Sequence, residues 1–321
     1  MAGAIFKVVF DAYVLLADSM MMQTPKPGLV TLALITVQLL FGINYVVSKI
    51  VIQAFDPFVW ASLRIAISTV AMFGFAVMSG HKPPKLTKSY LLPMVGFALL
   101  GTIINQVCFL VGLKHTTSSN SAVLNTLIPV FTLLVVTIRG QEAFTFRRGV
   151  GFFLALTGVL VLRKIENFKF SDETALGDLL TVTNCFSYAL FLSFSKSFFE
   201  KHDRIWTTAF LFLYGTIGIT AVAAPHWANF QFPEMNPNLW AAAFFAVFGA
   251  TLATYFLNFW ALAHAKSSRV ALYIYIQPVV TTLITWGFMG EPITLRTILS
   301  GLMIFLGMFF AMNWNFGPKR A

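Results

Sequence analysis

The chain contains few charged residues. Asp, Glu, Lys and Arg make up 11% of its 321 residues, against about 25% in soluble proteins. Hydrophobic residues make up 58%, and the mean hydropathy is +0.78. A soluble fold of this length needs a polar exterior, which this composition does not provide. The composition therefore excludes an ordinary soluble enzyme, a disordered chain and a secreted disulfide scaffold.

Motifs for catalysis, metal binding and nucleotide binding are also missing. The sequence has no Gly-x-x-x-x-Gly-Lys-Ser/Thr loop, no Gly-x-Ser-x-Gly and no His-Glu-x-x-His. The two cysteines, Cys108 and Cys185, lie in apolar stretches typical of packing residues. His115 and His264 have no second ligand at a spacing that suits a metal. We therefore expect a protein without enzyme activity, cofactor or metal.

Ten long apolar runs take up most of the chain. A hydrocarbon core about 30 Å thick needs about 20 residues of helix to cross it. The runs are unbroken rather than alternating at period two, which favours helices over a β-barrel. The sequence therefore predicts an all-α integral membrane protein. The predicted spans are 29–48, 58–78, 91–113, 119–138, 148–163, 176–195, 206–224, 239–262, 268–288 and 297–313.

The two ends of the chain lie outside these runs. Asp11 and Asp18 interrupt the apolar stretches of residues 1–28, which match neither a span nor a secretory signal. Residues 20–22 are all Met, so the segment is either upstream of the true translation start or a loose amphipathic leader. Residues 314–321 form a C-terminal tail.

The distribution of basic residues predicts the orientation. With a cytoplasmic N-terminus, 15 of the 22 Lys and Arg fall on the cytoplasmic side and 6 on the outer side, with Arg64 inside a span. The positive-inside rule then places both termini in the cytoplasm, and we expect the bacterial plasma (inner) membrane. The formal charge of +10 reflects this orientation and contact with membrane lipids. The sequence has no basic patch with interleaved aromatic residues, the pattern that would indicate nucleic-acid binding.

An internal repeat relates the two halves of the chain. At an offset of 149 residues, Thr102–Gly158 matches the second half at 14 of 57 positions without a gap. Each copy holds five predicted spans, and five is odd, so the second copy enters the membrane upside down. We expect ten transmembrane helices as two inverted five-helix repeats, 29–163 and 176–313, an arrangement found in secondary transporters. The matched pairs include His115 with His264, Pro129 with Pro278, and Glu142 with Glu291.

A Ser-Ser-x-x-Ala…Pro…Glu pattern occurs in both copies, at residues 118–142 and 267–291. With Trp60-Ala-Ser-Leu-Arg64 in the second span, it resembles the EamA-type members of the drug/metabolite transporter superfamily. The resemblance covers residues 29–313. It implies transport of amino acids, drugs or metabolites out of the cytoplasm, and it does not specify a substrate.

Two prolines and one arginine stand out inside the predicted spans. Pro129 and Pro278 each remove a backbone hydrogen bond and kink a helix, either as a paired hinge beside the substrate path or as static packing features. Arg64 should face the bundle interior, since a charge at mid-membrane is costly. It either binds a substrate carboxylate or bonds helix-end carbonyls.

Polar and aromatic residues inside the spans are the candidate cavity residues. Amides and phenols in lipid need partners, so we expect about half to line a cavity and the others to join helices. Asn184 and Tyr275 belong to the same set. The predicted substrate-binding residues are Asn44, Tyr45, Arg64, Asn105, Gln106, Asn125, Tyr188, Tyr214, Asn258, Trp260, Tyr273 and Gln277.

Charged residues at the span ends have expected local roles. Glu142 and Glu291 are expected to pair locally with Arg147 and Arg296 or with loop backbone donors, with a gating ion pair as the alternative. Thr145 and Thr294 are expected N-caps of the helices that follow. Lys49 and Lys196 are expected to close the first and sixth spans and to reach the headgroups.

These observations favour a secondary transporter, monomeric or homodimeric, that exports small organic metabolites such as amino acids. No Asp or Glu lies deep in a predicted span, which favours uniport or exchange over proton coupling. A nucleotide-sugar or phosphorylated-sugar exchanger would need paired basic residues in the cavity. A lipid-modifying membrane enzyme would need a catalytic polar cluster at one interface, and a receptor would not need inverted repeats.

Overall fold

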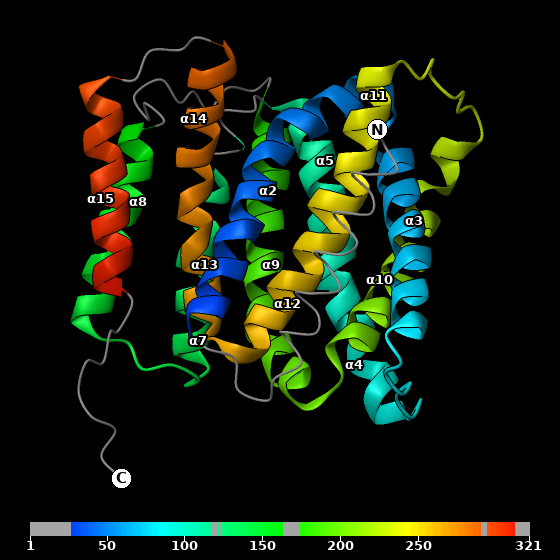
Figure 1. Cartoon of the computed structure of the whole chain (residues 1–321), viewed down its shortest axis with the longest axis horizontal. Coiled ribbons are helices and arrows are strands. Elements are labelled where there is room, and N and C mark those ends of the chain that lie inside the picture. Colours follow the sequence, from blue (N-terminus) through cyan, green and yellow to red (C-terminus); the bar gives the residue numbers. More distant parts are fainter. Residues whose placement is uncertain (1–26, 117–120, 122–123, 163–173, 290–293, 312–321) are drawn as a thin grey trace.

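The computed structural model describes residues 27–116, 121, 124–162, 174–289 and 294–311. These residues form helices joined by short turns, without a strand. The helices run side by side along one direction (Figure 1). Of the predicted leader only residues 27 and 28 are described, and Glu291 and the predicted tail lie outside the described residues.

The helices follow the predicted apolar runs. In chain order they are α2 (Pro27–Ala54), α3 (Pro57–Met78), α4 (Lys88–Ala98), η1 (Leu99–Ile104), α5 (Asn105–His115), α7 (Leu127–Ile138), α8 (Phe146–Leu162), α9 (Ala175–Lys201), α10 (Arg204–Trp227), α11 (Pro237–Phe244), η3 (Phe245–Ala253), α12 (Thr254–His264), α13 (Ser267–Leu272), η4 (Tyr273–Tyr275), α14 (Ile276–Met289) and α15 (Leu295–Ala311). η1 and η3 are π-helical and η4 is a 3₁₀ turn.

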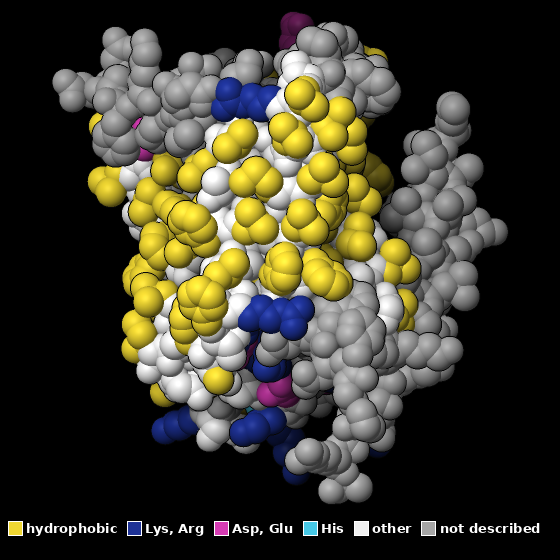
Figure 2. All heavy atoms as spheres, turned by 90° about the vertical axis from the view of Figure 1, so that its left-hand side faces the viewer, with side chains coloured by type: hydrophobic (Ala, Val, Ile, Leu, Met, Phe, Trp, Pro, Cys, Tyr) yellow, Lys and Arg dark blue, Asp and Glu magenta, His cyan; other side chains and the backbone are white. Residues whose placement is uncertain are grey.

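Six helical segments of the described chain are long and apolar enough to cross a membrane, and α7 and α15 are shorter apolar helices. On the side of α8 and α15, hydrophobic side chains form a band with Lys and Arg above and below it (Figure 2). An apolar band between charged ends suits a bilayer. The predicted all-α integral membrane class is therefore confirmed. The six segments are Gly28–Ala54, Pro57–Met78, Lys88–His115, Ala175–Lys201, Arg204–Trp227 and Pro237–His264.

Side-chain caps set where several helices begin. Asp56 accepts from the backbone N of Phe58 at 2.9 Å to start α3, and Asp203 accepts from Trp206 N at 2.9 Å to start α10. Thr145 and Thr294 accept from the backbone N three residues later at 3.3 Å, as expected of N-caps. These contacts fix sharp turns between helices.

The first and sixth predicted spans end too early. α2 continues to Ala54 and α9 to Lys201, so Lys49 and Lys196 do not close these helices. Lys49 Nζ donates to the carbonyl of Leu113 at 2.9 Å, and Lys196 Nζ to that of Leu262 at 3.2 Å. Each lysine thereby meets carbonyls at the C-terminal end of a neighbouring helix, α5 or α12, where a cation is favoured.

The same packing recurs in both halves at an offset of 149 residues. The segment Lys88–His115 has the same offset from Pro237–His264, and α8 from α15. α8 and α15 lie against each other at glycines: a Cβ on Gly151 would come within 2.6 Å of the Gly307 carbonyl O, and the converse distance is also 2.6 Å. Small residues there let two backbones approach closely.

Both prolines lie just after a break in the helix. Pro129 is the third residue of α7, after a turn at Thr126, so it lies in a first turn rather than at mid-helix. Pro278 is the third residue of α14, after the 3₁₀ turn η4. A proline cannot donate to the carbonyl four residues earlier, which explains why the regular helix starts near it. Hinge motion at these positions stays a prediction.

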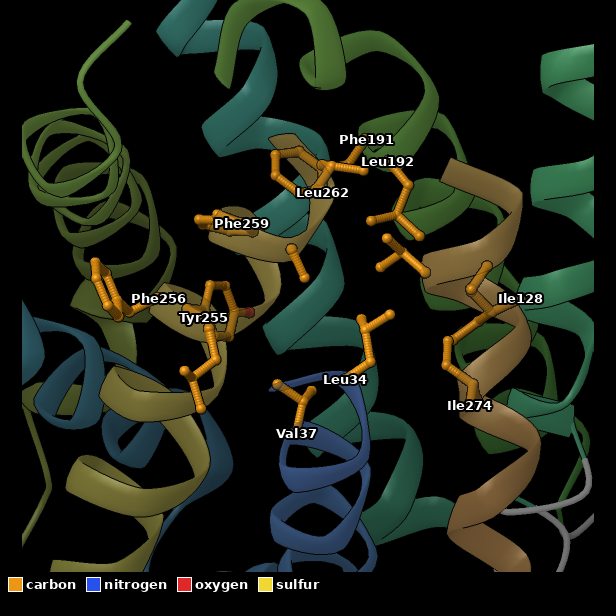
Figure 3. Close-up of a cluster of buried hydrophobic side chains, with 14 of the residues drawn as sticks. Leu34, Val37, Ile128, Phe191, Leu192, Tyr255, Phe256, Phe259, Leu262 and Ile274 are labelled. Atoms are coloured by element: carbon orange, nitrogen blue, oxygen red, sulfur yellow. The ribbon is translucent and has the colours of Figure 1, made fainter. Parts of the chain in front are cut away.

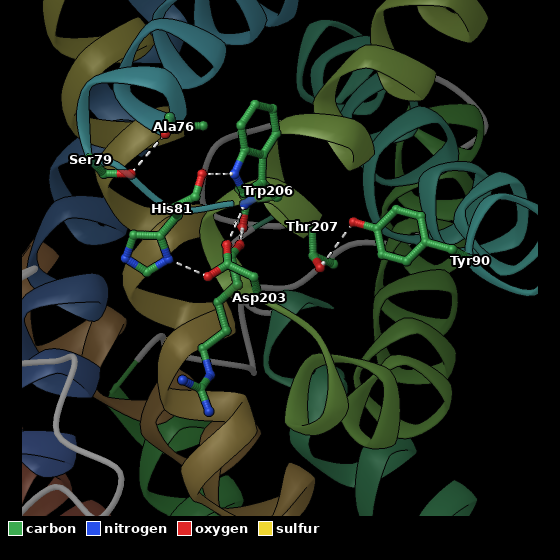
Figure 4. Close-up of polar contacts among 9 residues, drawn as sticks. Ala76, Ser79, His81, Tyr90, Asp203, Trp206 and Thr207 are labelled. Carbon is green, nitrogen blue, oxygen red and sulfur yellow. Dashed lines mark hydrogen bonds and ion pairs between the residues drawn. The ribbon is translucent and has the colours of Figure 1, made fainter. Parts of the chain in front are cut away.

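On the face shown in Figure 2, more Lys and Arg lie at the lower end of the bundle than at the upper end, and we call this lower end, which is also the lower end in Figure 1, the basic end. Of the 15 Lys and Arg in the described residues, 11 lie there and 3 at the opposite end. The segment after α3 is held at the basic end: His81 Nδ1 pairs with Asp203 Oδ2, and Trp206 Nε1 donates to the His81 carbonyl O at 2.9 Å (Figure 4).

A buried ion pair also lies at the basic end, and it corrects the predicted partner of Glu142. Glu142 Oε2 accepts from Arg148 Nη2 and Ser268 Oγ, both at 2.5 Å, and Oε1 accepts from Ser268 N at 3.2 Å. Arg147 instead lies 5.9 Å from the ring centroid of Phe310. Arg148 faces Ser268 of α13, and Arg147 faces Phe310 of α15. We call Glu142, Arg148 and Ser268 the Glu142 cluster; it joins the two halves.

Candidate functional site

A cavity lies in the interior of the bundle. About 90 Å³ of it is open to the centre of a water-sized sphere. Residues from both halves of the chain form its wall. The lining residues are Gln38, Phe41, Asn44, Tyr45, Arg64, Asn105, Gln106, Phe109, Asn125, Ile128, Asn184, Tyr188, Leu192, Ala250, Tyr255, Asn258, Val270, Ile274 and Gln277.

One part of the cavity wall is apolar. Ile128, Leu192 and Ile274 line it, and aliphatic and aromatic side chains from α2, α9 and α12 pack around them (Figure 3). Phe191 and Phe259 pack with ring centroids 5.2 Å apart, and both are fully buried. Close packing of this kind holds the helices that carry the polar groups in fixed positions.

A chain of hydrogen bonds crosses the cavity wall and starts at Arg64. Arg64 Nη2 donates to Gln106 Oε1 at 2.7 Å. Gln106 Nε2 donates to the Tyr255 hydroxyl at 3.2 Å, and that hydroxyl has two acceptors for its one proton, Asn105 Oδ1 and the Gly101 carbonyl O, both at 3.3 Å. Gln106 and Tyr255 are 149 residues apart, so the equivalent positions of the two halves meet here.

Three asparagines continue this chain. Asn105 Nδ2 donates to Asn184 Oδ1 at 2.6 Å, Asn184 Nδ2 to Asn125 Oδ1 at 3.0 Å, and Asn125 Nδ2 to the Ser121 carbonyl O at 2.8 Å. All donors point the same way, from the guanidinium to a backbone carbonyl. We call this series the polar chain. Each of its four amides both donates and accepts a hydrogen bond, which lowers the free-energy cost of burying them.

Other amides and phenols of the cavity join neighbouring helices. Gln277 Nε2 donates to Gln38 Oε1 at 2.6 Å, and Tyr45 OH donates to Gln277 Oε1 at 3.3 Å. Asn258 Nδ2 donates to the Tyr188 hydroxyl at 2.6 Å. These contacts tie α2 to α14 and α9 to α12, so the same residues shape the cavity and hold its wall together.

The charge in the cavity comes from Arg64. The side chain is 4% exposed, and none of the described lining residues is Asp or Glu. Its partner is the Gln106 amide rather than the helix-end carbonyls of the alternative interpretation. The Arg64 Nε atom is buried and has no acceptor. The site therefore contains one guanidinium, and one of its donor atoms is buried without a partner.

Nine of the twelve predicted substrate-binding residues line the cavity, and whether they bind a substrate stays a prediction. Tyr214, Trp260 and Tyr273 lie elsewhere. Trp260 packs on His264 at a centroid distance of 4.7 Å, Tyr273 is buried in η4, and Tyr214 packs against the hydrophobic core from α10. The rotation of each helix about its own axis turns these side chains toward neighbouring helices. The polarity of a residue alone does not indicate that rotation.

Two polar lining residues, Gln38 and Tyr255, are not among the predicted site residues. Both had a signal in the sequence. Gln38 is seven residues before Tyr45, which places both on one helix face. Tyr255 is 149 residues after Gln106 and thus occupies the equivalent position in the repeat.

The fold and the cavity together define a helical membrane protein with an internal site built by both halves of the chain. The model of the EamA-like transporter family matches residues 28–164 and again residues 175–313. The chain therefore belongs to the EamA-like transporter family, and the predicted resemblance is confirmed.

Two of the three relatives described here carry transporter names. An uncharacterized transporter of Archaeoglobus fulgidus is 26% identical over 87% of this chain and 95% of its own length. The uncharacterized transporter YyaM of Bacillus subtilis is 23% identical over 87% and 92%, and a WAT1-related protein of Arabidopsis thaliana is 24% identical over 87% and 83%. A solved crystal structure aligns with a TM-score of 0.70 at 16% identity, over 89% of this chain and 98% of the other, which shows the fold alone.

Proposed function

We propose that this protein is a secondary transporter that exports small organic metabolites, such as amino acids, by alternating access. The observation that carries the proposal is the cavity, because its polar chain runs from Arg64 in the first half to Asn184 and Tyr255 in the second. A site between two halves can face one side of a membrane and then the other when the halves rock about it.

The proposed architecture is ten transmembrane helices in two inverted repeats. Two observations support it. Helix bounds recur at an offset of 149 residues. In each half, a lysine of the first helix also donates to a carbonyl near the C-terminal end of the third spanning segment. With an odd number of crossings in each half, equivalent contacts lie at opposite ends of the bundle, as the C-terminal ends of α5 and α12 do in Figure 1.

The proposed orientation places the basic end in the cytoplasm of a bacterial plasma membrane, with both termini there. The 11 basic residues described at that end and the 3 at the other support it. Export is then movement from the basic end to the opposite end. The Glu142 cluster joins the two halves at this proposed cytoplasmic side.

The proposed substrate-binding residues are the nine cavity residues of the sequence analysis, with Pro129 and Pro278 as hinges. Because the described lining holds no carboxylate, uniport or exchange is favoured over proton coupling. A nucleotide-sugar exchanger is less well supported, since the described lining offers one guanidinium for a diphosphate. A lipid-modifying enzyme would need reactive groups that the cavity amides do not supply.

Flux through proteoliposomes tests the proposal. Purified protein is reconstituted, the vesicles are loaded with labelled amino acids and related metabolites, and release is followed over time. We expect saturable release of at least one compound, with loss of release in Asn184→Leu, which interrupts the polar chain. Protein-free vesicles and the variant Gln53→Leu, changed at an exposed position of α2, are the controls. Release equal to that of protein-free vesicles for every compound would contradict transport.

A further inference from the structure

The described cavity lining contains one formal charge, and that charge is positive. Arg64 supplies it, and the other described lining residues are amides, phenols and apolar side chains. A ligand with a net positive charge would find no carboxylate as a partner there, and burying an unpaired charge is costly. A ligand with one negative group would find a guanidinium. The lining therefore selects by charge as well as by size.

Arg64 is only partly used in the structure. Its Nη2 donates to Gln106 Oε1 at 2.7 Å, whereas its Nε has no acceptor although the side chain is 4% exposed. The Nε–H and one Nη–H of a guanidinium lie along one edge, and that edge matches the two oxygens of a carboxylate. The single amide oxygen of Gln106 accepts from Nη2, and Nε has no acceptor.

We propose that the transported substrate is a small monocarboxylate with a net charge of zero or −1. Its carboxylate displaces the Gln106 amide oxygen and accepts from both Nε and Nη2 of Arg64. This inference rests on the proposed transport function and specifies the substrate class. A zwitterionic amino acid fits, because amide oxygens of the lining can accept from its ammonium group. Amines without a carboxylate and polyanions do not fit.

Gln106 is then a positioning residue. It holds the guanidinium in place in the empty cavity, and its Nε2 donates to Tyr255 in the other half. When the substrate carboxylate binds the guanidinium, the Gln106 amide oxygen loses its hydrogen bond to Arg64. The hydrogen bond from Gln106 to Tyr255 can then rearrange. Substrate binding in the first half thereby changes a contact between the halves.

Compounds with one carbon skeleton and different charges test the charge rule on the wild-type protein. For a leucine-sized and a phenylalanine-sized skeleton, the amino acid, the deaminated carboxylate, its primary amide and the corresponding amine are compared by equilibrium binding and by flux. We expect the carboxylates and amino acids to bind, the amides to bind at least about tenfold more weakly, and the amines not to bind.

Two substitutions of Gln106 test the site. Gln106→Glu gives Arg64 a permanent internal carboxylate, and we expect at least about tenfold weaker carboxylate binding. Gln106→Leu removes the competing oxygen, and we expect equal or tighter binding. Gln53→Glu and Gln53→Leu, the same changes at an exposed position of α2, are the matched controls and are expected to bind as wild type. Elution profile and melting temperature establish that each variant is folded.

The outcomes separate this inference from the proposed function. Amines that bind as tightly as carboxylates would overturn the charge rule, and unchanged binding in folded Gln106→Glu would overturn the role of Arg64. If Gln106→Glu does not fold, weaker carboxylate binding by Gln106→Leu would overturn the displacement step. Saturable flux of other classes of compound would leave transport intact in each case. Absence of binding and flux for every compound would contradict the proposed function and this inference with it.

Discussion

The Glu142 cluster allows the effect of burial on an ion pair to be measured inside one protein. Glu142 and Arg148 form a pair at 2.5 Å whose side chains are each 5% exposed. Lys196 and Glu200 form another pair at 2.5 Å, with side chains 24% and 42% exposed. The two pairs have the same separation and differ in their access to water. We predict that neutralising Glu142 destabilises the fold far more than neutralising Glu200.

The expected magnitudes follow from the partners. In Glu142→Gln the amide keeps one acceptor where three donors converge, from Arg148 and from the hydroxyl and backbone N of Ser268. Breaking a buried ion pair from one side costs about 3–5 kcal/mol, because the other charge stays buried. Glu200→Gln removes an exposed pair four residues apart on a helix, which contributes about 0.3–0.5 kcal/mol. The expected ratio is about tenfold.

Reversible unfolding with SDS in mixed micelles measures both free energies. The double variant Glu142→Gln/Arg148→Met is expected to be more stable than Glu142→Gln alone, because it removes the stranded guanidinium charge. A loss below about 1 kcal/mol for Glu142→Gln, equal to that of Glu200→Gln, would refute the reasoning. That result would mean that water reaches the cluster in the folded protein.

Three further predictions concern orientation, hinges and packing. In a cysteine-free background, cysteines placed in residues 80–88 are expected to react only from the cytoplasm and those in 226–237 only from outside; labelling of both from one side would contradict the ten-span topology. Pro129→Ala and Pro278→Ala are each expected to slow flux more than they weaken equilibrium binding, since a restored backbone bond stiffens the helix; normal flux in both would leave the prolines as packing features. Gly151→Leu is expected to destabilise the fold by at least about 1–3 kcal/mol, because its Cβ would lie 2.6 Å from a carbonyl O of α15. SDS unfolding measures this loss. A free energy of unfolding equal to that of the wild type would show that α8 and α15 do not touch.

Lipid makes the helices of this protein predictable from sequence, because it requires long apolar runs with internal hydrogen bonds. The ends of α2 and α9 were less predictable. Residues after Lys49 and Lys196 continue the helix, and the acceptors of both lysines lie more than sixty residues away in the chain. The π-helical segments η1 and η3 had no sequence signal that we used. Glycine packing such as Gly101 against the Phe191 ring arises only in the folded bundle.

The candidate site was predictable to the extent that buried polar groups must find partners. That requirement selected the amides of the polar chain, since an amide in lipid faces another polar group or a cavity. It could not decide between the two arginines after Glu142, because both are within reach along the chain. Rotation of α8 turns Arg148 toward Ser268. Rotation likewise turns Trp260 away from the cavity, toward His264.

The two halves share their packing but differ in the chemistry of the cavity. The helix bounds recur in both halves, and so do the lysine contacts, so the repeat accounts for the shape of the scaffold. Arg64 does not recur: α10 carries no Lys or Arg after its first residue. Gln106 meets Tyr255 rather than another glutamine. A symmetric scaffold can rock between two equivalent states, whereas an asymmetric cavity lining can hold a polar ligand in one orientation. Changes at single cavity positions can therefore alter the transported compound without altering the motion that carries it.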